Sequence, residues 1–170
     1  MQDDPILPVC ESASAPQQNQ MNTPHRILEA EDDISIRLLN TERLVHAGYE
    51  VDAAEDAAAA WKALNNDNYD LLITDHNMPK LTGVELLKKL RAAQMVLPVI
   101  LLSGKVPNEE FTRYPWLQFT AVLLKPYTFA ELLVTVKEVL STTNGARQLL
   151  EPTPNFQSRP AIALSGTLPR

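Results

Sequence analysis

The sequence predicts an α/β fold, a doubly wound five-stranded parallel sheet with helices on both faces. Short apolar runs of strand length alternate along the chain with segments whose apolar residues recur at helical spacing. The turns between these segments are short, and strands that alternate with helices in this way form right-handed βαβ units with parallel strands. The central run, Leu71 to Ile73, has the continuous apolar character of a strand buried on both faces.

Five strands are expected. They lie at residues 26–30 and 49–53, and in three further apolar runs that end at Asp75, Ser103 and Lys125. Glu29 lies inside the first strand and departs from this apolar pattern. A carboxylate in a strand covered on both faces must be paired or protonated, and the sequence does not identify a partner for it.

Four segments have the periodicity of amphipathic helices. Their apolar positions are Ile36, Leu39, Leu44 and Ala47; Ala57, Ala60, Trp61 and Leu64; Leu86, Leu87 and Leu90; and Phe129, Leu132, Leu133, Val136, Val139 and Leu140. Gly48 is expected to end the first of these helices and Asp56 to cap the second. Between Lys105 and Thr120 two prolines allow one short helix at most, near residues 108–113.

Charged and polar side chains stand where four of the strands end. Glu31 and Asp32 follow the first strand, Asp75 ends the central one, and Ser103 and Lys125 end the last two. In open α/β sheets this carboxyl edge is where ligands bind. Clustered carboxylates repel one another unless a cation is shared between them, and a site of oxygen ligands and phosphate suits Mg²⁺.

Residues 25–140 resemble the receiver domain of response regulators in two-component signalling. The stretch DHNMPKLTG, from Asp75 to Gly83, carries the most specific part of the resemblance, the pattern DxNMPxxxG. The resemblance implies a flavodoxin-like, receiver-type fold and assigns a role to each matching residue. Asp75 is the phosphoacceptor, Glu31 and Asp32 form the acidic pair that holds magnesium, Ser103 is the switch hydroxyl, and Lys125 is the lysine before a proline.

The same resemblance implies how the site is used. Mg²⁺ would be held directly by Asp32, Asp75 and the backbone carbonyl of Asn77, and through water by Glu31. Lys125 would pair with Asp75 at rest and with a phosphoryl oxygen after transfer, and its bond to the following proline would be cis.

One position departs from the family pattern. Most receivers carry an aromatic residue three positions before the lysine, and here that residue is Val122. Valine has one preferred rotamer and little volume to move. We therefore expect the usual coupling between Ser103 and the last strand and helix to be weakened or rerouted, with residues 105–116 as the substitute.

Two other functions remain open. One is a receiver-like interaction scaffold that does not turn over phosphate. The other is an aspartyl-nucleophile phosphatase of the haloacid-dehalogenase type, but that family has a second acid where this chain has Asn77. His76 is a poor candidate for a general base, because adjacent residues at a strand end point apart. No enzyme activity is expected beyond self-catalysed phosphoryl transfer and autodephosphorylation.

The amino-acid composition argues against nucleic acid and membranes as partners. The net charge of −6 argues against nucleic acid, which requires a basic face. The single cysteine, Cys10, permits neither a disulfide framework nor a cysteine metal site, and no run approaches the ~20 apolar residues that span a bilayer. We expect a soluble cytoplasmic protein, without a membrane contact, whose partners are a sensor histidine kinase or histidine phosphotransfer protein and a downstream protein target.

The chain divides into three expected parts. Residues 1–24 form a disordered arm, residues 25–142 the receiver domain, and residues 143–170 a mostly disordered tail. The tail has one segment, around residues 156–164, that is apolar enough to dock on the domain. No output domain is expected, so the signal would leave through protein–protein contact.

Overall fold

The computed structural model describes residues 23–150, apart from the side chains of Phe111 and residues 144–150. Five strands form one parallel sheet in the order β2-β1-β3-β4-β5, which confirms the predicted fold class. The strands are β1 (Arg26–Ala30), β2 (Glu50–Ala54), β3 (Leu71–Asp75), β4 (Val99–Ser103) and β5 (Ala121–Leu124). The chain runs from β1 to β2 on one side and then to β3 on the other, so the strand order reverses between β1 and β3.

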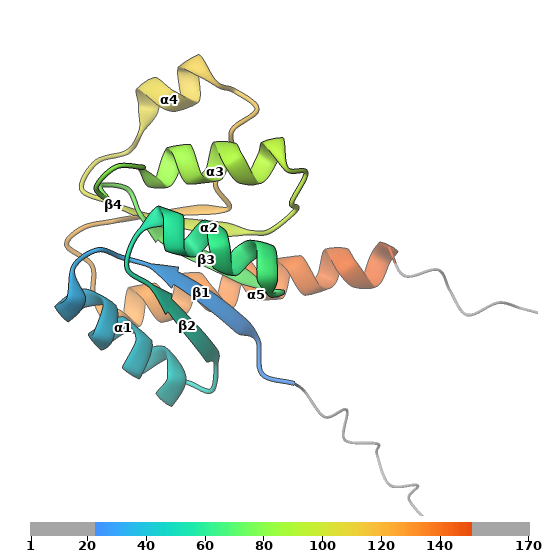
Figure 1. The fold of residues 1–170 in the computed structure, drawn as a ribbon. Helices are drawn as coiled ribbons and strands as arrows, with labels where there is room; N and C mark the ends of the chain where they lie inside the picture. Colours follow the sequence, from blue (N-terminus) through green and yellow to red (C-terminus); the bar gives the residue numbers. More distant parts are fainter. Residues whose placement is uncertain (1–22, 151–170) are drawn as a thin grey trace, which may run out of the picture.

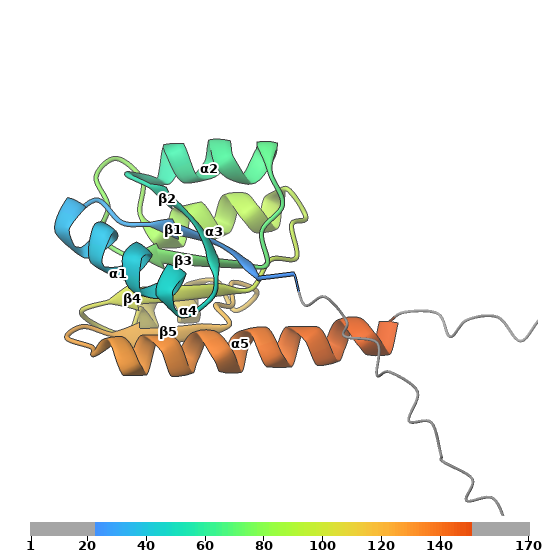
Figure 2. The same ribbon diagram turned by 90° about the horizontal axis from the view of Figure 1, so that it is seen from below.

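Helices cover both faces of the sheet in two layers (Figures 1 and 2). They are α1 (Ile34–His46), α2 (Ala57–Asn66), α3 (Gly83–Ala92), α4 (Asn108–Arg113) and α5 (Phe129–Leu150). α1 and α5 pack on one face, and α2 and α3 pack on the other. The sheet therefore lies between two apolar layers.

The alternation of side chains along β3 divides the core into two clusters. Leu71 and Ile73 contact the layer of α1 and α5, whereas Leu72 contacts the layer of α2 and α3. All five residues of β3 are buried, as are all five of β4. Asp75 is thus the last residue of a fully buried strand, which fixes its backbone firmly.

Local signals set the helix ends. The side chain of Asp33 accepts hydrogen bonds from the amides of Ser35 and Ile36, and Asp56 accepts one from Ala59, as predicted for that cap. Thr82 and Glu85 form a reciprocal capping box at the start of α3. Gly48 follows α1 with φ of +94°, a conformation that glycine adopts without strain.

The buried face of α1 differs from the predicted one. Asn40 and Leu44 are buried, whereas Leu39 is 47% exposed and Ala47 is also exposed. A polar residue, Asn40, therefore occupies a core position of this helix.

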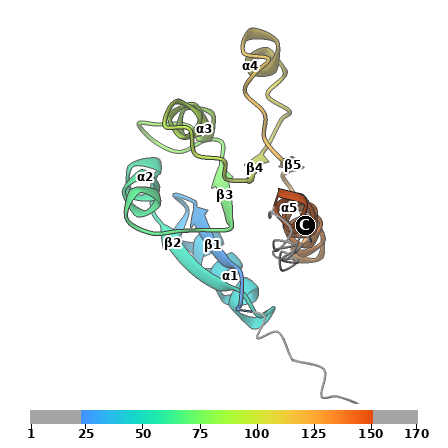
Figure 3. The same ribbon diagram turned by 90° about the vertical axis from the view of Figure 1, so that its right-hand side faces the viewer.

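α4 has the predicted bounds, yet it lies outside α3 and away from the sheet (Figures 1 and 3). No side chain caps it at Pro107, and it consists of six residues. A helix this short contributes little stability of its own.

α5 continues to Leu150, eight residues beyond the expected end of the domain at residue 142. The expected N-terminal arm, except its last two residues, and the expected docking segment at 156–164 lie outside the described residues. Within residues 23–150, no helix combines the length and apolar character needed to cross a membrane.

Candidate functional site

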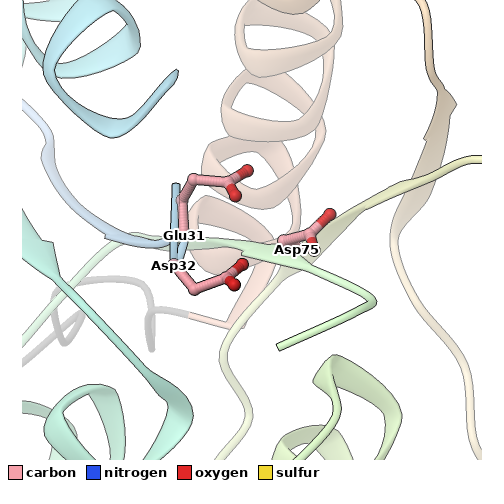
Figure 4. A group of neighbouring side chains, drawn as sticks. All are labelled: Glu31, Asp32 and Asp75. Carbon is pink, nitrogen blue, oxygen red and sulfur yellow. The ribbon is translucent and has the colours of Figure 1, made fainter. Parts of the chain in front are cut away.

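The reversal of strand order brings three carboxylates together. Glu31 and Asp32 follow β1 and Asp75 ends β3, and one carboxylate oxygen from each lies within 4.8 Å of the others (Figure 4). Glu31 and Asp75 are buried, at 1% and 4% exposure, whereas Asp32 is exposed. The predicted acidic cluster is therefore formed at the switch point of the sheet, where open α/β folds bind ligands.

Both carboxylate oxygens of Asp75 have partners. Oδ1 lies 2.8 Å from Nζ of Lys125, and Oδ2 accepts a hydrogen bond of 2.8 Å from the amide of Asn77. The amide comes from the loop that follows β3, so the backbone itself orients the carboxylate. The ammonium group of Lys125 is therefore in contact with Asp75, its expected partner.

Lys125 also pairs with a second carboxylate. Its Nζ lies 3.1 Å from Oε2 of Glu31, so one ammonium group bridges two buried acids. Burial disfavours the charged lysine, but the hydrogen bond to Asp75 and the charges of both acids outweigh it and raise the pKa of Lys125. The bond between Lys125 and Pro126 is cis, as the resemblance implied.

Glu31 is the less solvated of the acidic pair. Burial, followed by the charge of Asp75, raises the pKa of Glu31, and its contacts with Lys125 and the amide of Asp33 oppose this shift. The cluster thus holds more negative charge than its single ammonium neutralises. Such a site attracts a hard cation.

Gly83 permits α3 to start directly against the end of β3. A Cβ atom on Gly83 would collide with the backbone carbonyl oxygen of Asp75 and would come within 3.0 Å of Leu101 Cδ1. The amide of Gly83 also donates to the carbonyl of His76, at 3.2 Å. The glycine of the DxNMPxxxG pattern therefore sets the position of the Asp75 backbone.

Ser103 stands at the same edge of the sheet but is engaged elsewhere. It is 1% exposed, and its hydroxyl donates a hydrogen bond of 2.7 Å to the carbonyl of Lys105. Its own carbonyl accepts from the amide of Lys125, at 2.8 Å. Val122 pairs with Leu101 in the sheet and is partly buried.

Arg37 is a site residue that the sequence reading missed. Its guanidinium donates to the backbone carbonyl of Glu31 and, at 3.3 Å, to that of Asp32. An arginine placed one turn into the helix that follows an acidic loop could have suggested this contact. The side chain clamps the loop on which both acids stand.

Glu29 has the partners that the sequence could not name. Oε1 accepts from Nδ2 of Asn40 at 2.8 Å, and Oε2 accepts from the hydroxyl of Thr41 at 3.0 Å. Desolvation raises the pKa of Glu29 to about 7, against the effect of these two bonds. Nδ2 of Asn40 also lies 3.2 Å from the hydroxyl of Tyr127, so this network reaches the loop that carries Lys125.

The donor set fits Mg²⁺. Three carboxylates converge, one of them solvent-exposed, and neither sulfur nor imidazole is in the group. Asn77 follows in the loop after β3, with an exposed side chain. His76, by contrast, is not part of the cluster and lines a cleft between α3 and α4. Asp75 and His76 thus belong to different groups of side chains.

Comparison with known proteins places the chain in a family. The sequence pattern described as "Response regulator receiver domain" matches residues 27–137. The chain is 33% identical over 117 residues to the alkaline phosphatase synthesis transcriptional regulatory protein PhoP of Bacillus subtilis, with 68% of this chain and 48% of that protein covered. It is 28% identical to the chemotaxis protein CheY of Pseudomonas aeruginosa, with 71% of this chain and 99% of that protein covered.

Solved structures of receiver proteins have a similar fold. The chemotaxis response regulator CheY4 of Vibrio cholerae has a TM-score of 0.63 at 32% identity and covers 69% of this chain and 99% of its own. A receiver domain protein from Methanospirillum hungatei has a TM-score of 0.68 at 27% identity, covering 72% and 98%. The chain spans about half the length of the first curated relatives it matches, which are transcriptional regulatory proteins. This chain belongs to the response regulator receiver domain family of two-component signalling.

Proposed function

We propose that the protein is a phosphoacceptor that is phosphorylated on Asp75 in the presence of Mg²⁺ and signals by binding another protein. The observation that carries this proposal is the environment of Asp75. It is a buried carboxylate paired with Lys125 and placed beside Glu31 and Asp32, at the open edge of the sheet. Buried acids that share one cation are costly to the fold, which indicates a functional reason for the cluster.

Phosphoryl transfer to Asp75 requires little covalent chemistry from the protein beyond the nucleophile itself. A carboxylate oxygen of Asp75 attacks the phosphorus of a phosphohistidine, the P–N bond breaks, and an aspartyl phosphate forms. The amide of Asn77 holds the nucleophile in one orientation. Formation of the aspartyl phosphate removes the carboxylate charge of Asp75. Lys125 can then leave Asp75 and pair with a phosphoryl oxygen.

A bound Mg²⁺ supplies positive charge to the phosphoryl oxygens and keeps the neighbouring acids ionised. The residues that would hold it are Asp32, Asp75 and the backbone carbonyl of Asn77, with Glu31 acting through water. Arg37 holds the loop of the acidic pair through backbone carbonyls, which leaves the carboxylates themselves available.

Ser103 is the residue that reports the phosphoryl group. Its hydroxyl must exchange the carbonyl of Lys105 for a phosphoryl oxygen, and this exchange pulls on the loop between β4 and α4. Val122 offers no ring to rotate, so we propose that the change is passed to residues 105–116 instead of to α5.

The phosphodonor is a sensor histidine kinase or a histidine phosphotransfer protein. Ile34 and Leu38 lie on the first turns of α1, directly after the acidic loop, and are 61% and 63% exposed. Apolar side chains this exposed beside a charged site suit a protein contact. We propose that the donor protein covers them while its histidine approaches Asp75.

The decisive experiment is incubation of the full chain with acetyl phosphate and Mg²⁺, followed by intact mass measurement. We expect one added phosphoryl group, which is lost in base and absent after chelation of Mg²⁺. Asp75→Asn should abolish it, whereas Asp33→Asn should not, because asparagine still caps α1. Equal labelling of Asp75→Asn and the native chain would refute the assignment.

The labelling experiment, together with an assay of released phosphate, separates the rival functions. A scaffold without phosphate turnover would stay unlabelled at every Mg²⁺ concentration. A phosphatase would release phosphate from added monoesters repeatedly, which requires an acid at the position of Asn77 to protonate the leaving group.

A further inference from the structure

A cleft of about 400 Å³ lies between α3 and α4, outside the site described above. Its lining comes from the loop after β3, from the first two turns of α3 and from α4. The lining includes His76, Lys88, Glu109, Glu110, Arg113 and Tyr114. None of the cleft's lining residues belongs to the carboxylate cluster.

His76 lines this cleft, and one of its ring nitrogens has no hydrogen-bond partner. Its side chain is nine-tenths buried, and its Nδ1 is the one buried side-chain polar atom without a hydrogen-bond partner among the described residues. Leaving such an atom unpaired costs about 1–3 kcal/mol. This nitrogen is covered from solvent, so a group bound in the cleft would satisfy it only after a small shift of the His76 side chain.

Among the charged residues that line the cleft, Glu85 is engaged in the capping box of α3, and the others favour a cationic group. Lys88 and Arg113 lie over the ring of Tyr114, at 3.8 and 5.6 Å from its centroid. No hydrogen bond or ion pair through the carboxylates of Glu109 and Glu110 is found in residues 23–150, and Glu110 is only partly exposed. The two unpaired acids thus stand on the α4 wall, while the two cations are held against an aromatic ring.

We propose that this cleft binds a basic segment of a protein partner, anchored by an arginine side chain. A guanidinium group carries five donors in a planar fork, enough to meet both carboxylates of α4 and the Nδ1 of His76. Trp116, which is 58% exposed and packs edge-on against Tyr114 at 6.0 Å, extends the surface with an aromatic side chain typical of interface anchors.

The cleft is mechanically joined to Asp75. The amide of His76 donates to the carbonyl of Leu102 at 2.8 Å, and its carbonyl accepts from Gly83. One lining residue of the cleft is thus the next residue after the proposed phosphoacceptor, and one wall is the short helix that follows Ser103. Control of the cleft by phosphorylation rests on the proposed function, whereas binding to the unmodified chain does not.

The test uses isotope-labelled full chain and the blocked peptide acetyl-Gly-Arg-Gly-Arg-Gly-amide as probe. We expect saturable NMR shifts at the rings of His76 and Tyr114. The same peptide with citrulline in place of arginine should bind at least about fivefold more weakly, because it keeps the shape and loses the charge. Glu109→Gln combined with Glu110→Gln should weaken binding of the arginine peptide by a similar factor.

A matched variant controls for net charge. Glu42→Gln combined with Glu138→Gln removes two exposed acids from α1 and α5 and should leave peptide affinity within about twofold. Equal binding of the citrulline peptide, equal loss in both double variants, or shifts that map away from His76 and Tyr114 would each overturn the proposal.

A second arm repeats the titration after acetyl phosphate treatment of the native chain and of Asp75→Asn. A change in peptide affinity confined to the native chain shows control by phosphorylation. If no phosphoryl group is added at all, the proposed function fails, yet the titration of the unmodified chain still decides the cleft.

Discussion

Asn40 donates a hydrogen bond of 2.8 Å to the carboxylate of Glu29, so a side chain of α1 satisfies an acid buried in the central part of the sheet. This bond explains why a polar residue occupies a core position of α1. Both residues are at most 5% exposed. The carboxyl group of Glu29 nevertheless stays hard to ionise, with a pKa of about 7.

The first prediction concerns the pH dependence of folding. The pKa of Glu29 in the folded chain lies above the ordinary value of 4.5. The contribution of protonated Glu29 to the free energy of unfolding is therefore complete below pH ~4.5 and is lost as the pH rises through about 7. Glu29→Gln stays neutral, so the native chain should lose about 3 kcal/mol relative to this variant over that interval. Urea unfolding at a series of pH values measures the difference, and parallel profiles for the two proteins would contradict it.

The second prediction concerns Gly83. Alanine at this position collides with the backbone of Asp75, which the buried strand cannot move aside. We expect Gly83→Ala to lower the free energy of unfolding by about 1–3 kcal/mol and to slow labelling by acetyl phosphate. Gly104→Ala is the matched control, because a Cβ there meets no atom within 4 Å. Equal stability of the two variants would show that α3 can shift without cost.

The third prediction concerns the ammonium that bridges two acids. Lys125→Met leaves Glu31 and Asp75 buried without their cation. We expect the free energy of unfolding to fall by about 2–3 kcal/mol in the presence of a chelator. Added Mg²⁺ should restore part of this loss, since it replaces the missing positive charge. Lys62→Met, at an exposed position of α2, should change neither the free energy of unfolding nor its response to Mg²⁺. A loss that Mg²⁺ leaves unaltered would argue against a metal at the cluster.

The fourth prediction concerns Arg37. Lysine carries a point charge and cannot reach the carbonyls of Glu31 and Asp32 together. We expect Arg37→Lys to weaken Mg²⁺ binding by about tenfold in calorimetric titration while the chain remains folded. Arg43→Lys, one helix turn and a half further along α1, should bind Mg²⁺ as the native chain does. Indistinguishable affinities for Arg37→Lys and the native chain would remove Arg37 from the site.

The fifth prediction concerns the route of the signal. Phosphorylation should free the carbonyl of Lys105 from Ser103, and the loop that follows has a short uncapped helix to move. Amide exchange should therefore change most in residues 103–116 and much less in 129–140. Changes centred on α5 would show that the usual face is used in spite of Val122.

The sequence was sufficient for the fold because each signal was local. Apolar runs of strand length, the caps at Asp56 and Gly48, and the stripe on α5 all depend on residues within a few positions of one another. The gathering of Glu31 and Asp75 was also predictable, since parallel strands present their carboxyl ends at one edge.

What could not be predicted depends on contacts between distant elements. The partner of Glu29 lies on another element, and nothing near Asn40 in the sequence marks it as buried. Leu39 was expected in the core because its residue type is apolar, but the orientation of α1 is set by the sheet and by α5. The second pairing of Lys125, with Glu31, likewise depends on how β1 and β5 sit in three dimensions.

The ion pair between Glu31 and Lys125 joins residues 94 positions apart, from just after the first strand to just after the last. Such a contact is among the last that a growing or refolding chain can make, because the intervening loop must close before the pair is gained. A chain that has yet to place β5 has an acidic loop and an aspartate but no lysine between them. If Asp75 accepts a phosphoryl group as proposed, that ability therefore requires the finished sheet, and a chain that has not yet placed β5 should not be phosphorylated.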